Sequence, residues 1–133
     1  MYITGENNIP TMAGIGYFTI PADDVARAAK FYQSLLGWKI EPDTVLENKS
    51  LQWQNIITGE PEEGLVNRGG IFKRYMPGPI MNFVIVPDFE QVYNDVEKRG
   101  GKIVMPRNAI KNVGLVAVIQ DTEGNIIGLL KPE

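Results

Sequence analysis

Apolar and polar residues recur along the chain in the same order twice. The stretch Tyr17–Asp23 aligns with Asn82–Asp88 at an offset of 65 residues. Each stretch alternates as a half-buried strand does and then leads into apolar positions at helical spacing. A second match, between Gly37–Ile40 and Gly101–Val104, has nearly the same offset. The chain therefore reads as an internal repeat.

Each half predicts one helix. Asp23 or Asp24 is a natural N-cap for the first, and Gly37 is a natural end. In the second half, Asp88 is the predicted N-cap and Gly100–Gly101 the predicted helix end. The apolar stripes of the two helices are Val25, Ala28, Ala29, Tyr32, Leu35 and Leu36, and Phe89, Val92, Tyr93 and Val96.

Three strand-like runs follow each helix. They cover residues 38–40, 51–58 and 70–73 in the first half, and 102–105, 114–120 and 126–130 in the second. Each half is thus strand–helix–strand–strand–strand, a βαβββ module, within residues 12–75 and 79–133. The connection Met76–Pro79 is too short for a flexible linker. We therefore expect a single α+β domain over residues 1–133.

Alternation also assigns side chains to the two faces of each predicted sheet. Phe18 and Ile20, with their counterparts Phe83 and Ile85, should pack against the helices. Two such sheets placed edge to edge and curled would enclose the other face in a shared trough. That face carries Tyr17, Thr19, Asn82 and Val84. Trp53 and Gln54 lie on opposite faces of one strand, and the pattern leaves open which of them faces the trough.

Composition excludes several kinds of site. The 133 residues include no cysteine and no histidine, so zinc held by imidazole or thiolate is impossible within this chain. The net charge is −3 and the basic residues are scattered, which argues against nucleic-acid binding. The start of the chain lacks the features of a signal peptide, and no apolar run is long enough to span a bilayer. We expect a cytoplasmic protein without a membrane or nucleic-acid partner.

Four stretches give the chain a resemblance to a known superfamily. They are GYFTIPADDVARAAKFYQSLLGW, NRGGIFKR, NFVIVPDFEQVYNDVEKRGGKIV and VGLVAVIQDTEGNIIGLL. They resemble the vicinal oxygen chelate superfamily, which includes glyoxalase I, bleomycin-resistance proteins and extradiol dioxygenases. The resemblance implies two βαβββ modules forming a cupped mixed sheet, as in the glyoxalase/bleomycin-resistance fold, and often a homodimer.

The resemblance also implies where metal ligands would lie. Metal-using members carry His or Gln on the first strand of each module and Glu near the last strand. The matching positions here are Tyr17, Asn82, Gly70 and Gly128. A phenol, an amide and two glycines do not offset the dehydration of a divalent ion. We therefore expect no metal and no other cofactor.

The resulting hypothesis is a metal-free trough that binds a small, partly apolar organic molecule. Its candidate lining residues are Tyr17, Thr19, Gln54, Asn82, Val84 and Gly128. Tyr17 could instead fill space left by the metal, and Asn82 could bond to a neighbouring strand. Gly70 and Gly128 either leave room for a ligand or mark a bulge or tight crossing.

Two other functions stay open. The alternative is an isomerase, lyase or dioxygenase of the same superfamily with atypical metal ligands. It needs a well-placed acid or base, and Tyr17 is the only such group predicted in the trough. A regulatory module that uses the same sheet to bind a partner is the third possibility.

Overall fold

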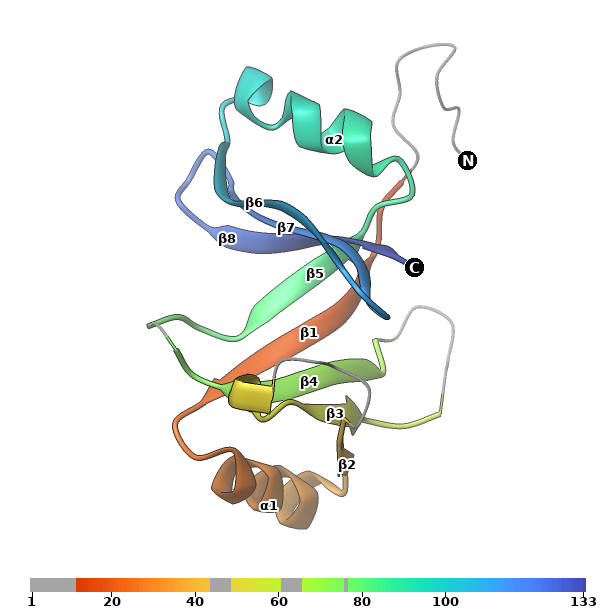
Figure 1. The fold of residues 1–133 in the computed structure, drawn as a ribbon, viewed down its shortest axis with the longest axis vertical. Coiled ribbons are helices and arrows are strands. Elements are labelled where there is room, and N and C mark those ends of the chain that lie inside the picture. Colours follow the sequence, from red (N-terminus) through yellow and green to blue (C-terminus); the bar gives the residue numbers. More distant parts are fainter. Residues whose placement is uncertain (1–11, 44–48, 61–65, 76) are drawn as a thin grey trace. The chain divides into compact units, whose positions relative to one another are not determined.

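The computed structural model describes residues 12–43, 49–60, 66–75 and 77–133. These residues form eight strands and two α-helices in two compact units. Among the described residues, the N-terminal unit lies within Gly16–Asn82, and the C-terminal unit comprises Phe83–Glu133 with residues 12–15 (Figure 1). The order strand–helix–three strands occurs twice, which confirms the predicted α+β class. The single domain and the shared trough stay predictions.

The N-terminal unit is a four-stranded mixed sheet with one helix. Its sheet has the order β2–β3–β4–β1. β1 and β4 are parallel, whereas β4–β3 and β3–β2 are antiparallel. The elements are β1 (Ile15–Ala22), α1 (Val25–Leu36), β2 (Lys39–Pro42), β3 (Gln54–Ile57) and β4 (Arg68–Lys73), with a 3-10 turn at Lys49–Leu51 before β3.

Helix α1 begins and ends where the sequence predicts. The Asp24 carboxylate accepts a hydrogen bond from the backbone N–H of Arg27 at 2.9 Å. Gly37 adopts φ 72°, and its N–H donates to the carbonyl of Gln33 at 3.0 Å. This left-handed residue ends the helix at little steric cost because glycine has no Cβ.

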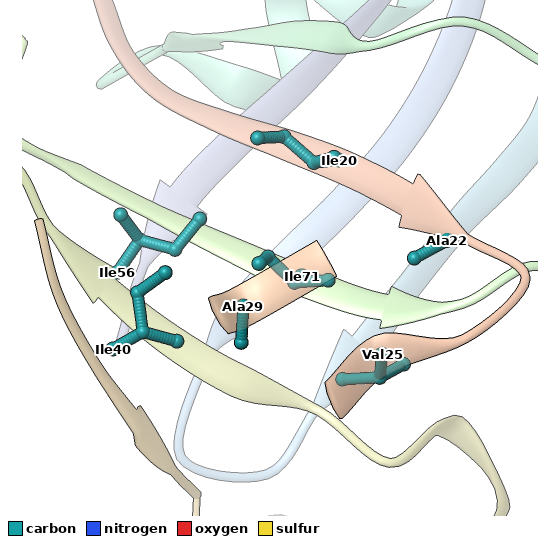
Figure 2. Close-up of a cluster of buried hydrophobic side chains, with 7 residues drawn as sticks. All are labelled: Ile20, Ala22, Val25, Ala29, Ile40, Ile56 and Ile71. Atoms are coloured by element: carbon teal, nitrogen blue, oxygen red, sulfur yellow. The ribbon is translucent and has the colours of Figure 1, made fainter. Parts of the chain in front are cut away.

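The core of the N-terminal unit lies between α1 and one face of the sheet. Figure 2 shows side chains from α1 and all four strands meeting there: Ile20, Ala22, Val25, Ala29, Ile40, Ile56 and Ile71. Ile56 and Ile71 are completely buried. Phe18 packs against the same cluster, so the predicted orientation of Phe18 and Ile20 towards the helix is confirmed.

The C-terminal unit repeats this plan. β5 and β8 are parallel, whereas β8–β7 and β7–β6 are antiparallel. The edge strand β6 carries Pro106 and two shifts of register, a usual place for a proline in a sheet. The elements are β5 (Met81–Ile85), α2 (Phe89–Asp95), β6 (Lys102–Ile110), β7 (Gly114–Gln120) and β8 (Ile126–Pro132), with a 3-10 turn at Glu97–Arg99 after α2.

The ends of α2 match the prediction only in part. Gly100 adopts φ 96° and ends the helical segment, as expected. Asp88 occupies the N-cap position, but its side chain makes no capping hydrogen bond.

Neither described helix has the length and apolar character that a membrane-spanning helix needs.

One expectation for the C-terminal unit is wrong. Val84 packs against the cluster formed by Val86, Phe89, Ala117 and Leu129, so it faces α2. Phe83 lies on the opposite face, because its ring covers Gly128. Alternation then places Ile85 on the face of Phe83, and Asn82, which is exposed, on the face of Val84.

The cause is a slip of one residue in the repeat alignment. Ala22 and Val25 of the first core correspond to Val86 and Phe89 of the second, an offset of 64 rather than 65. Because successive side chains of a strand point to opposite faces, a slip of one reverses the assignment of every residue in that strand.

Candidate functional site

The face of the N-terminal sheet opposite α1 carries the candidate site, and we call it the helix-free face. Tyr17 and Thr19 lie on it because they alternate with Phe18 and Ile20. Gly70 pairs with Thr19 on one side and with Asn55 on the other. The central strand β4 therefore joins the residues of β1 and β3 in one surface.

Aromatic rings cover the middle of the helix-free face. A Cβ atom added to Gly70 would lie 2.0 Å from Cζ2 of Trp53, so the indole rests directly on this glycine. The Trp53 ring also stacks with Phe72, with ring centroids 6.0 Å apart and planes 16° apart. Position 70 is glycine because any side chain would displace the indole. The glycine does not open empty space here, and Phe83 covers Gly128 in the same way.

A chain of hydrogen bonds fixes the polar edge of these rings. Nε1 of Trp53 donates to Oδ1 of Asn55 at 2.9 Å. Nδ2 of Asn55 donates to Oδ2 of Asp43 at 3.1 Å, and the backbone N–H of Asp43 donates to the carbonyl of Trp53 at 3.1 Å. Asn55 thus has both ends of its amide occupied, which holds the Asp43 carboxylate and the indole in fixed positions.

Tyr17 belongs to the same polar group. Burial and, to a smaller extent, the negative charge of Asp43 raise the pKa of Tyr17 to about 12, and the positive charge of Arg68 opposes this shift. Both charges act on Tyr17 because they lie near its phenol. At neutral pH the phenol is therefore protonated, and it can donate and accept hydrogen bonds but cannot act as a base.

Charge changes beside Tyr17 should shift its titration in opposite directions. Asp43→Asn removes a charge that disfavours the phenolate, so the pKa of Tyr17 falls from about 12. Arg68→Gln removes a charge that favours the phenolate, so the pKa rises. A pH titration of tyrosinate absorbance in each variant measures these shifts. The part of the titration that is absent in Tyr17→Phe belongs to Tyr17. Shifts of the same sign in both variants would contradict the arrangement.

The raised pKa also sets the direction of a stability change. Between pH 10 and about 12, the unfolded chain loses the Tyr17 proton while the folded chain retains it. The folded state binds more protons, so stability falls as the pH rises through this window.

The predicted site residues are scattered by the fold. Tyr17 and Thr19 share the helix-free face, and Thr19 is buried. Gln54 lies on the other face, because it alternates with Trp53 and shares its direction with Ile56 of the core. The expectation that Val84 faces away from the helix is wrong, since it packs beside α2. Asn82 is exposed, and Gly128 lies beneath Phe83.

Sequence reasoning missed three polar residues of this face. Asp43, Asn55 and Arg68 lie beside Trp53 or Tyr17, although the sequence predicted Tyr17 as the only acid–base group. The alternation of Asn55 with Gln54 was an available signal, once Trp53 was placed on the helix-free face. Asp43 gave no such signal, because it follows the last residue of β2 and is brought to Asn55 by strand pairing.

The residues at the family's ligand positions do not fit a divalent cation. Tyr17 holds its proton, and Gly70 and Gly128 carry no side chain. With the corrected repeat, the counterpart of Tyr17 is Met81, whose thioether suits soft metals only. In the described part of the chain, no group of three or more carboxylate, imidazole or thiolate side chains could hold a metal ion.

Known proteins are similar in sequence to most of this chain. Residues 14–129 match the Glyoxalase/Bleomycin resistance protein/Dioxygenase superfamily. A putative glyoxylase, CFP32, of Mycobacterium bovis is 30% identical over 107 residues, which are 80% of this chain and 41% of that protein. A glyoxylase-like domain-containing protein of Didymella fabae is 32% identical over 111 residues, 80% of this chain and 84% of that one. The chain spans well under half of the mycobacterial relative.

Solved structures share the fold at low sequence identity. Methylmalonyl-CoA epimerase from Mycobacterium tuberculosis has a TM-score of 0.67 and 14% identity, covering 90% of this chain and 88% of that chain. A Streptomyces coelicolor methylmalonyl-CoA epimerase in complex with 2-nitronate-propionyl-CoA has a TM-score of 0.70 and 12% identity, covering 92% and 99%. This likeness concerns the fold alone. Together with the sequence match, it confirms the predicted resemblance, and the chain belongs to the Glyoxalase/Bleomycin resistance protein/Dioxygenase superfamily.

Proposed function

We propose that this chain binds a small, partly apolar organic molecule on the helix-free face of the N-terminal unit, without a metal ion. The observation that carries the proposal is the hydrogen-bond chain from Trp53 through Asn55 to Asp43. It fixes an aromatic surface beside a polar edge. Such a combination of apolar walls and a few placed polar groups is typical of small-molecule sites.

The chemistry of this face indicates what kind of ligand it would bind. The parallel rings of Trp53 and Phe72 offer a flat apolar surface, which favours a planar or thioether-bearing partner. The neutral phenol of Tyr17 and the carboxylate of Asp43 offer hydrogen bonds to its polar end. Thr19 lies on the same face of the sheet.

The structural relatives agree with a small-molecule role. One is a methylmalonyl-CoA epimerase in complex with methylmalonyl-CoA, and another holds 2-nitronate-propionyl-CoA. Their identity to this chain is only 12%, so the likeness supports the class of function and not a particular ligand. The homodimer and the cytoplasmic location expected from the sequence stay part of this proposal. Sedimentation tests the homodimer.

A second candidate function is metal-independent proton transfer on a bound ligand. It is favoured by Asp43, a half-buried carboxylate that Asn55 holds in a fixed orientation. A carboxylate so placed is a candidate general base. Asp43→Asn distinguishes the two functions, because it should abolish turnover of a substrate but leave much of the binding to the aromatic surface.

The proposal predicts binding that survives removal of metals. Aromatic and thioether compounds are screened by thermal shift, and hits are measured by calorimetry on chelator-treated protein. Trp53→Leu should weaken the binding of such a compound roughly tenfold or more, because stacking on an aromatic side chain contributes about 1–3 kcal/mol to binding. Leu35→Ala is the control, because Leu35 is 64% exposed on α1, away from the helix-free face.

Two results would count against the proposal. One is a hit that binds Trp53→Leu as tightly as the unchanged protein. The other is elemental analysis that finds one tightly held divalent ion per chain, with binding lost after chelation. That second result would favour the alternative of an isomerase, lyase or dioxygenase with atypical ligands.

A further inference from the structure

A groove on the opposite side of the N-terminal unit has the features of a second site. It runs between α1 and the end of β1, with a volume of about 370 Å³. This volume falls within the range of roughly 300–1,000 Å³ found for small-molecule sites. Its lining residues come from β1, the turn between β1 and α1, α1 itself and the segment after β4. The groove is therefore separate from Trp53 and Asn55.

The inner wall of the groove is apolar. Ile20 and Ala22 of β1 lie at its base and are 5% and 6% exposed, so a small part of each faces the groove. Phe31 of α1 lines the same groove but is 56% exposed, and its ring meets that of Tyr32 edge-on at 5.3 Å. A flat apolar molecule lying in the groove would cover the Phe31 ring and remove this apolar surface from water.

One guanidinium is held rigidly at the groove. Nε of Arg74 donates to Oδ1 of Asp23 at 2.9 Å, Nη1 to the carbonyl of Gly78 at 3.1 Å, and Nη2 to the carbonyl of Pro21 at 3.4 Å. A guanidinium carries five N–H donors, and these bonds to described residues use three of them. A donor group fixed in advance loses little entropy when it binds an anion.

A second guanidinium belongs to the same groove. Arg27 lies one helical turn before Phe31 on α1, and both line the groove. Two carboxylates line the groove as well: Asp24 accepts the backbone N–H of Arg27 as the helix cap, and Asp23 forms an ion pair with Nε of Arg74. The groove thus joins an apolar wall to two guanidinium groups and two carboxylates, and only the guanidinium groups can donate hydrogen bonds to an anion.

We propose that this groove binds a small molecule with a flat apolar body and a carboxylate. The body lies against Phe31 and the wall of β1, and the carboxylate is shared by Arg27 and Arg74. Arg27 is exposed and adjusts to the ligand, whereas Arg74 is preorganised. This inference does not depend on the function proposed for the helix-free face.

The test is an NMR titration of the whole chain with 2-naphthoate. Backbone amide shifts should change in residues 20–32 and at Arg74, and the affinity should fall as salt is added. Arg27→Gln should weaken binding roughly tenfold, because a charge-assisted hydrogen bond is lost. Lys30→Gln, an equal loss of charge at an exposed position of the same helix outside the groove lining, should leave the affinity unchanged.

Several results would overturn this proposal. Binding of 2-naphthylmethylammonium as tight as that of 2-naphthoate would show that the guanidinium groups do not select an anion. Equal affinity in the Arg27→Gln variant would remove the anion site. Shifts confined to Trp53 and Asn55 would assign 2-naphthoate to the helix-free face, leaving that function intact while refuting the groove.

Discussion

Replacing Phe89 with alanine should lower the free energy of unfolding by about 3–5 kcal/mol. Phe89 is 1% exposed and is the first residue of α2. It packs with Val86, Ala117 and Leu129 in the core of the C-terminal unit, and its ring stacks with Tyr93 at 5.9 Å. Alanine loses this burial and leaves a cavity that surrounding strands cannot close fully.

Chemical denaturation of the variant measures this loss. Phe31→Ala is a matched control, because the same atoms are removed from a ring that is 56% exposed. Its expected cost is no more than about 1 kcal/mol, as for other surface substitutions. Similar losses in the two variants would show that Phe89 does not hold the core of its unit.

Gly70→Ala should destabilise the protein by about 1–3 kcal/mol, although alanine is usually the better residue in a strand. Its Cβ would lie 2.0 Å from Cζ2 of Trp53, so the indole must move. The indole is not free to do so, because Asn55 accepts its N–H and Phe72 stacks against it. The steric cost therefore exceeds the gain in strand propensity.

Two variants isolate the contact between Gly70 and Trp53. Gly14→Ala makes the same change where the added Cβ has no neighbour within 4 Å, so stability should change little. In a Trp53→Leu background, Gly70→Ala should cost much less than in the unchanged protein, since the ring is gone. A double-mutant cycle from thermal or denaturant unfolding gives this coupling. Additive losses would contradict the packing of Trp53 over Gly70.

Sequence reasoning succeeded where local chemistry decides the structure. Asp24 and Gly37 define the ends of α1, because an N-cap acceptor and a left-handed glycine act within one turn. The faces of β1 were also predictable, since Phe18 and Ile20 alternate with Tyr17. The order of elements followed from these local patterns.

The second half shows where the same reasoning fails. Phe83 resembles Phe18 in sequence, which favoured the offset of 65. Asp24, however, matches Asp88 at an offset of 64, and the core follows this second alignment. The N-cap is a safer guide to register than one shared aromatic residue, because a strand changes face at every step.

The candidate site depended on contacts that a local pattern does not contain. Tyr17 and Thr19 were predictable from β1 alone. Asp43 and Asn55 meet only because β2 and β3 pair with a particular register, in which Pro42 lies opposite Gln54. Gly70 was predicted to leave room for a ligand or to mark a bulge. Instead, the indole of Trp53, which precedes β3, packs directly on it.

The most direct test is a crystal structure of the protein, purified without chelator and soaked with the tightest hit of the thermal-shift screen. We expect density for the organic molecule against Trp53 and Phe72, with its polar end at Tyr17 or Asp43 and no coordinated ion between them. A divalent ion bound by side chains of the helix-free face would contradict the account. So would a ligand bound elsewhere while this face is left unoccupied.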